Sequence, residues 1–123
     1  MKILVIDDSG VMRRIHKNTL TEHKIKEGDI IEAIDGQEAL EIANKEEIGL
    51  FLIDWNMPKV DGLKLVKALR AMEKYKETPL IMITSEAAKY NVMEAVQSGV
   101  TNYIVKPIRG ETLWNKLSKY IDT

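Results

Sequence analysis

Side chains capable of phosphate chemistry stand directly after short apolar runs of this sequence: Asp7 and Asp8, Asp54, Thr84, and Lys106. Brought together, the three carboxylates would repel one another, by about 1–4 kcal/mol for two unit charges ~4 Å apart. Such a cluster requires a cation, and its hard oxygen ligands favour Mg²⁺ with water in the open positions. A Mg²⁺ held in this way can receive phosphate oxygens, and a lysine would add a second positive charge.

The apolar runs predict the elements that would assemble these residues. Each run has the length of a strand, and several are continuous rather than alternating, which is typical of strands buried on both faces. The runs are 3–6, 30–34, 50–53, 80–83 and 103–105. Segments with helical spacing lie between them, so we expect an α/β fold: one doubly wound, five-stranded parallel sheet with five helices, flavodoxin-like. The chemistry would then lie at the carboxyl ends of the strands.

Individual positions in the helical segments allow more local predictions. Ser9 is a candidate N-cap for the first helix, and Ile15 is expected on its buried face. We interpret His16 as a solvated surface residue and Met93 as a packing residue. Gly99 is expected to end the fourth helix.

Composition narrows the class of protein. The 123 residues fit one domain, residues 1–123, and no linker, repeat or output domain is expected. The 18 basic and 19 acidic residues give a formal net charge of −1, which argues against non-specific binding of nucleic acid. No apolar run approaches the ~20 residues of a membrane span. The absence of cysteine fits a reducing compartment, and we expect a cytoplasmic protein.

The order of the polar residues resembles that of a known family. The pairs Asp7-Asp8 and Lys106-Pro107, together with Asp54 and Thr84, are similar to the receiver domain of two-component response regulators from Lys2 to about Ile121. The stretches 8–14, 54–58 and 61–63 are most similar to the chemotaxis members of that family.

The resemblance implies a role for each site residue. Asp54 would be the phosphoacceptor, Thr84 would hydrogen-bond the phosphoryl group, and Lys106 would pair with it. Mg²⁺ would be held by Asp7, Asp8, Asp54 and the backbone carbonyl of Asn56. Tyr103 would be an aromatic switch that turns inward on phosphorylation.

The resemblance also implies partners. A sensor histidine kinase would donate the phosphoryl group, a flagellar motor switch protein would bind the output face, and a phosphatase would be a further partner. That face would contain Lys89, Val92, Tyr103, Val105 and Lys116.

Asn56 and Glu86 would flank the attacking water and give a short-lived phosphoryl group. Ser85 and Ile108 depart from the family pattern. The protein would be a monomeric signalling switch rather than a conventional enzyme.

Three alternatives stay open at the level of sequence. A phosphorelay carrier would pass its phosphoryl group to a histidine phosphotransfer protein. A Mg²⁺-dependent phosphohydrolase would also use an aspartate nucleophile, although such enzymes usually place it after the first strand, with a second aspartate two residues on. A flavodoxin-like nucleotide binder would need a neutral or glycine-rich first loop, and Asp7-Asp8 would repel its phosphate.

Overall fold

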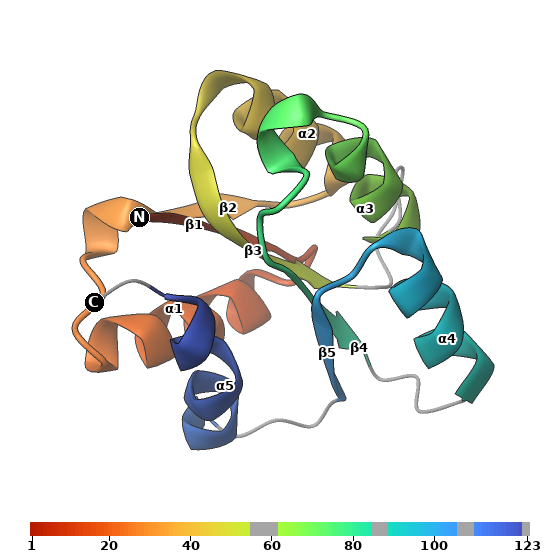
Figure 1. The fold of residues 1–123 in the computed structure, drawn as a ribbon. Helices are drawn as coiled ribbons and strands as arrows, with labels where there is room; N and C mark the ends of the chain where they lie inside the picture. The colour runs from red at the N-terminus through yellow and green to blue at the C-terminus, as the bar shows by residue number, and fades with distance from the viewer. Residues whose placement is uncertain (55–61, 85–88, 106–109, 122–123) are drawn as a thin grey trace.

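Five parallel strands form the centre of the molecule in the order β2-β1-β3-β4-β5 (Figure 1). The computed structural model describes residues 1–54, 62–84, 89–105 and 110–121, and for residues 84 and 89–92 the description is of the backbone. The strands are β1 (Lys2–Ile6), β2 (Ile30–Ala33), β3 (Ile48–Asp54), β4 (Leu80–Thr84) and β5 (Asn102–Val105). The predicted five-stranded parallel sheet is confirmed.

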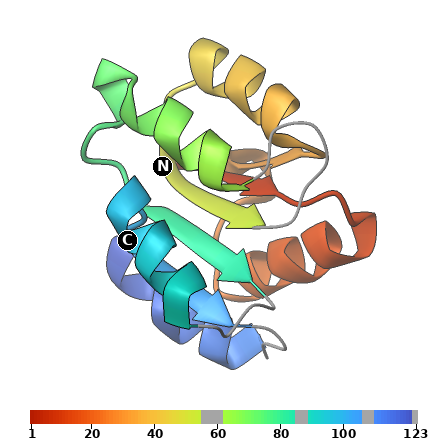
Figure 2. The same ribbon diagram turned by 90° about the vertical axis from the view of Figure 1, so that its right-hand side faces the viewer.

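Five α-helices cover the two faces of the sheet in the described residues: α1 (Gly10–Glu22), α2 (Gly36–Lys45), α3 (Gly62–Arg70), α4 (Lys89–Ser98) and α5 (Gly110–Leu117). Short 3₁₀ turns, η1 (Glu27–Asp29), η2 (Glu73–Tyr75) and η3 (Ser118–Tyr120), complete the connections. Helices α1 and α5 lie side by side, and α2, α3 and α4 pack on the opposite face (Figures 1 and 2). The sheet is therefore doubly wound.

The two faces of β1 explain why the apolar runs are continuous. Ile3 and Val5 are buried against α1 and α5, whereas Leu4 and Ile6 are buried against α2 and α3. Successive side chains of a strand point to opposite faces, so a strand covered on both sides must be apolar at every position.

Helix α1 begins as the sequence predicts, but its buried face differs. The Ser9 hydroxyl accepts a hydrogen bond from the amide of Met12 at 3.2 Å, which confirms the N-cap. His16 is buried and Ile15 is 43% exposed, so the interpretation of His16 as a surface residue is wrong. Positions 15 and 16 both fit a helical stripe with Thr19 and Leu20. The prediction favoured Ile15 for the buried position because isoleucine is apolar and histidine is polar.

The end of α4 also combines a confirmed and a corrected prediction. Gly99 follows the helix with φ +109°, a region that favours glycine, so its predicted role as a helix end is confirmed. Met93 is 52% exposed, and the prediction that it packs in the core is wrong. None of the helices in the described residues is long and apolar enough to span a membrane.

Candidate functional site

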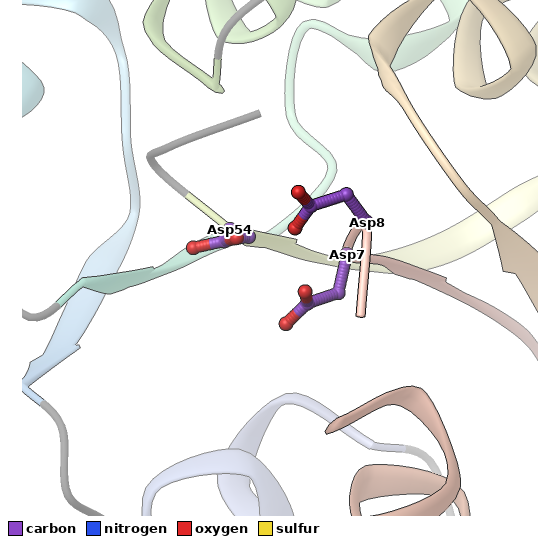
Figure 3. A group of neighbouring side chains, drawn as sticks. All are labelled: Asp7, Asp8 and Asp54. Atoms are coloured by element: carbon purple, nitrogen blue, oxygen red, sulfur yellow. The ribbon is translucent and has the colours of Figure 1, made fainter. Parts of the chain in front are cut away.

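Three carboxylates converge at the carboxyl edge of the sheet. Asp7 and Asp8 follow β1, and Asp54 ends β3, the neighbouring parallel strand, with Ile6 and Ile53 in register. One carboxylate oxygen from each of the three lies within 4.8 Å of the others. Figure 3 shows the three side chains beside one another at the ends of their strands. Asp7 and Asp54 are buried and Asp8 is exposed, so the group is open to solvent on one side. The predicted acidic cluster is therefore present.

Local hydrogen bonds fix the loop that holds this cluster. The amide of Asp7 donates to the carbonyl of Ala33 on β2 at 3.1 Å. The carboxylate of Asp7 accepts from the amide of Ser9 at 2.9 Å, and Nη1 of Arg13 donates to the Asp7 carbonyl at 2.7 Å. Asp7 is thus held through its amide, its carbonyl and its side chain, and the position of its carboxylate is set before any ligand binds.

The three carboxylates fit a divalent cation of the Mg²⁺ type. All the donor atoms are hard oxygens, and their spacing allows them to share one ion. Burial of two of the three carries a desolvation cost that a cation would offset. The exposed side of the cluster, at Asp8, leaves room for water or phosphate oxygens. Asp7, Asp8 and Asp54 are therefore the residues that would hold Mg²⁺.

The ends of the next two strands lie on the other side of Asp54. Asp54 is in register with Ile83 of β4, and Thr84 is in register with Val105 of β5. The backbone of Thr84 is thus at the same edge of the sheet as the carboxylates. The Thr84 side chain lies outside the described part of the structure, as do the remaining predicted site residues Asn56, Glu86 and Lys106.

The predicted output residues lie on β5, α4 and α5. Tyr103 is half-buried and packs against the core beneath α2, α3 and α4, while Val105 and Lys116 are exposed. Tyr103 and Val105 are two residues apart in a strand and therefore share one of its faces. Lys89 and Val92 begin α4, and their side chains lie outside the described part.

Two further residues of α4, which were not predicted from the sequence, belong to the same surface as the output residues. Met93 and Val96 are 52% and 57% exposed, respectively. Positions 89, 92, 93 and 96 follow the spacing i, i+3, i+4, i+7 and so share one stripe of the helix. The apolar i, i+3 pair could have been found from sequence, but exposure could not, because the same pattern is typical of a buried face.

Arg13 also contacts the acidic site, and this contact was not predicted from the sequence. Besides its bond to Asp7, its Nε donates to Oε1 of Glu32 on β2 at 3.1 Å. Its acceptor at the site is a backbone carbonyl. Every residue has a backbone carbonyl, so the sequence does not indicate which one is the acceptor.

Comparisons with known proteins bear on this site. The chain matches the family described as "Response regulator receiver domain" over residues 3–118. It is 47% identical over 124 residues to a protein named "Chemotaxis protein CheY homolog" from Campylobacter jejuni, and the match covers 100% of this chain and 94% of that one. It is 46% identical over 124 residues to "Chemotaxis protein CheY1" of Helicobacter pylori, covering 100% and 98% of the two chains.

A solved structure shares the fold closely. The chemotaxis response regulator CheY4 of Vibrio cholerae superposes with a TM-score of 0.90 at 35% sequence identity, covering 98% of both chains. This chain is thus similar to chemotaxis response regulators over its whole length. The similarity includes the part of the chain that forms the sheet, the helices on its two faces and the acidic edge.

Proposed function

Because this chain belongs to the response regulator receiver family, we propose that it is a chemotaxis switch that accepts a phosphoryl group on Asp54. A sensor histidine kinase in the cytoplasm donates the group in a Mg²⁺-dependent reaction, and the phosphorylated protein binds a flagellar motor switch protein. The supporting observation is the convergence of Asp7, Asp8 and Asp54 at one edge of the sheet.

Asp54 is the acceptor because of its place in the sheet. It ends β3, the central strand, so the Asp7–Asp8 pair lies on one side and the ends of β4 and β5 on the other. A carboxylate oxygen of Asp54 attacks phosphorus in line, the phosphorus–nitrogen bond of the phosphohistidine breaks, and the imidazole nitrogen takes the electron pair. The product is an acyl phosphate on Asp54.

The other residues position the group and balance charge. Asp7, Asp8 and Asp54, with the backbone carbonyl of Asn56, would hold Mg²⁺, and the bound ion would neutralise charge on the phosphoryl oxygens. Lys106 immediately follows β5 in the sequence and supplies the second positive charge. The hydroxyl of Thr84, at the end of β4, donates a hydrogen bond to the phosphoryl group. Asn56 and Glu86 border the approach of hydrolytic water and keep the phosphoryl group short-lived.

Phosphorylation alters the surface formed by α4, β5 and α5. The new group adds a charge of about −1.5 to −2 and three acceptor oxygens. Movement of Thr84 toward it opens space for Tyr103, whose half-buried ring already packs against the core. The surface combines exposed Val96, Val105 and Lys116, which suits a short segment of acidic and apolar residues from the motor switch protein. The protein is thus a two-state element biased by a local charge.

A phosphorylation assay tests the proposal. The protein is incubated with acetyl phosphate and Mg²⁺, the added phosphoryl group is measured by intact mass, and the fluorescence of Trp55, the neighbour of Asp54 in sequence, is recorded. We expect one phosphoryl group and a fluorescence change in the parent and neither in Asp54→Asn. Glu47→Gln, an exposed carboxylate at the opposite edge of the sheet, should behave as the parent does. Labelling of Asp54→Asn to the level of the parent would contradict the proposal.

Three further assays on the same protein distinguish the alternative functions. Phosphorylated parent should bind a peptide from the motor switch protein more tightly than the unphosphorylated form. Transfer of the group to a histidine phosphotransfer domain, without peptide binding, would indicate a phosphorelay carrier. Sustained turnover of a simple phosphomonoester would indicate a phosphohydrolase.

A further inference from the structure

Arg13 connects the acidic site to the edge of the sheet. Its side chain leaves α1 and turns back toward β1, where Nη1 donates to the carbonyl oxygen of Asp7 at 2.7 Å. Its Nε donates to Oε1 of Glu32 on β2 at 3.1 Å. The side chain of Arg13 is largely buried, and one guanidinium group therefore joins α1, the end of β1 and β2.

The carbonyl that Arg13 contacts belongs to the peptide group between Asp7 and Asp8. A peptide group is planar, so holding its oxygen fixes the plane that joins the two residues. That plane sets the relative positions of the Cα atoms from which the two side chains extend, and the bond from the Ser9 amide to the Asp7 carboxylate, 2.9 Å long, holds the Asp7 side chain. Arg13 therefore acts on the direction in which both carboxylates face Asp54.

Glu32 keeps Arg13 in this position. Its second oxygen lies 3.9 Å from Nζ of Lys17, which in turn pairs with Glu27 at 3.1 Å. The guanidinium fork is thus held at one end by a carboxylate and at the other by the Asp7 carbonyl, and Arg suits such a two-point contact because its donors are fixed in one plane.

We propose that Arg13 is a positioning residue for the cation site: it orients the Asp7–Asp8 peptide so that both carboxylates converge with Asp54 on one divalent cation. This inference rests on the proposed Mg²⁺-dependent function. Arg13 does not touch the cation, and it acts through a backbone carbonyl.

The direction of the change in Mg²⁺ affinity tests the proposal, because Arg13 carries a charge as well as an orienting hydrogen bond. A guanidinium near a cation site repels the cation, so removing only its charge would tighten Mg²⁺ binding. Removing its orienting hydrogen bond would weaken Mg²⁺ binding, and loss of such an outer support typically changes metal affinity 10–100-fold. Electrostatics and positioning thus predict opposite results for the same substitution.

The experiment measures Mg²⁺ affinity by calorimetry in Arg13→Gln, Arg13→Lys and Arg14→Gln. We expect Arg13→Gln to weaken Mg²⁺ binding about tenfold or more. Arg14 is exposed on the same helix and carries the same charge, so Arg14→Gln should leave the affinity unchanged or slightly tighter. Arg13→Lys keeps the charge and one donor nitrogen but not the planar fork, and its Mg²⁺ affinity should lie between those of the parent and Arg13→Gln.

A second readout uses the metal-free protein. The amides of Asp8 and Ser9 should exchange hydrogen faster in Arg13→Gln than in Arg14→Gln, because the Asp7–Asp8 peptide is no longer held. Unchanged or tighter Mg²⁺ binding by Arg13→Gln, in a parent that binds Mg²⁺, would overturn the positioning role alone. A parent that does not bind Mg²⁺ would overturn this inference together with the proposed function.

Discussion

The guanidinium group of Arg70, at the end of α3, donates from Nε to the carbonyl oxygen of Gly99, the residue after α4, at 2.8 Å. Its Nη1 donates to the carbonyls of Tyr75 and Thr78, both at 2.7 Å, and Nη2 donates to Oγ1 of Thr101 at 3.1 Å. Partial burial lowers the pKa of Arg70, although it stays charged. One side chain thus joins α3, the approach to β4 and the turn between α4 and β5.

Replacement of Arg70 should destabilise the fold without changing the acidic site. Arg70→Met removes charge-assisted hydrogen bonds to backbone groups that are only partly buried, so water replaces some of them. We expect a loss of about 2–3 kcal/mol in the free energy of unfolding, measured by urea denaturation. Lys67→Met, an exposed residue of the same helix, is the control and should change stability little. Equal stability of the two variants would show that the Arg70 contacts contribute nothing net.

Substitution of Gly99 should be costly for two separable reasons. Its φ of +109° strains any residue with a side chain, and a Cβ there would lie 2.9 Å from Cγ of Arg70. We expect Gly99→Ala to lower the free energy of unfolding, measured by urea denaturation, by about 1–3 kcal/mol. Truncation of Arg70 relieves the contact but not the backbone strain, so the double variant Arg70→Ala/Gly99→Ala should lose less stability than the sum of the single variants. Strict additivity would mean that the backbone alone sets the cost.

The acidic site was predictable from sequence because it depends on strand ends. Continuous apolar runs predict strands buried on both faces, and parallel strands place the residues that follow them at one edge. The sequence therefore predicts that Asp7, Asp8 and Asp54 lie together, and the structure confirms this prediction. The end of α4 at Gly99 was predictable in the same way, because a positive φ requires an unusual residue type.

Contacts with backbone groups were not predictable. Arg70 reaches carbonyls that lie five, eight and twenty-nine residues away in the chain, and Arg13 reaches the carbonyl of Asp7. Every residue has a carbonyl, so no pattern of residue types indicates which one an arginine will find. The burial of His16 was missed because the helical period fits Ile15 equally well, and only packing against the sheet decides between them.

Loss of a single buried hydroxyl at Tyr75 should be measurable. Its oxygen lies 2.7 Å from the carbonyl oxygens of Ala43 and Glu46, which share its one proton, and it accepts from the amide of Ile48 at 3.4 Å. Tyr75→Phe keeps the edge-to-face packing against Phe51 and removes the hydroxyl from these three backbone groups, of which the Ala43 and Ile48 contacts are buried. We expect a loss of about 1–3 kcal/mol in urea denaturation.

A second tyrosine provides the matched control for Tyr75→Phe. The hydroxyl of Tyr120 is contacted only by a long hydrogen bond from Asn102, 3.4 Å, among the described residues, and Tyr120 is half-exposed. Tyr120→Phe should therefore change stability by much less. A loss as large as that of Tyr75→Phe would show that burial of the hydroxyl does not determine its contribution.

Mg²⁺ should stabilise the protein through the carboxylate cluster, and Asp8 should set the concentration required. A ligand that binds the folded state alone adds about 2.7 kcal/mol of stability at 100 times its dissociation constant, so the thermal midpoint should rise as Mg²⁺ is added. Asp8→Asn removes one negative charge from the group of three. At ~4 Å a unit charge contributes about 1–4 kcal/mol, which corresponds to at least about a fivefold weaker affinity. The Mg²⁺ concentration for half of the thermal shift should rise by that factor in Asp8→Asn and stay unchanged in Glu47→Gln, whose exposed carboxylate precedes β3 at the opposite edge. Two results would show that the three carboxylates do not act together on one cation. One is a thermal midpoint of the parent that does not change when Mg²⁺ is added, and the other is an Asp8→Asn protein whose midpoint responds to Mg²⁺ as the parent's does.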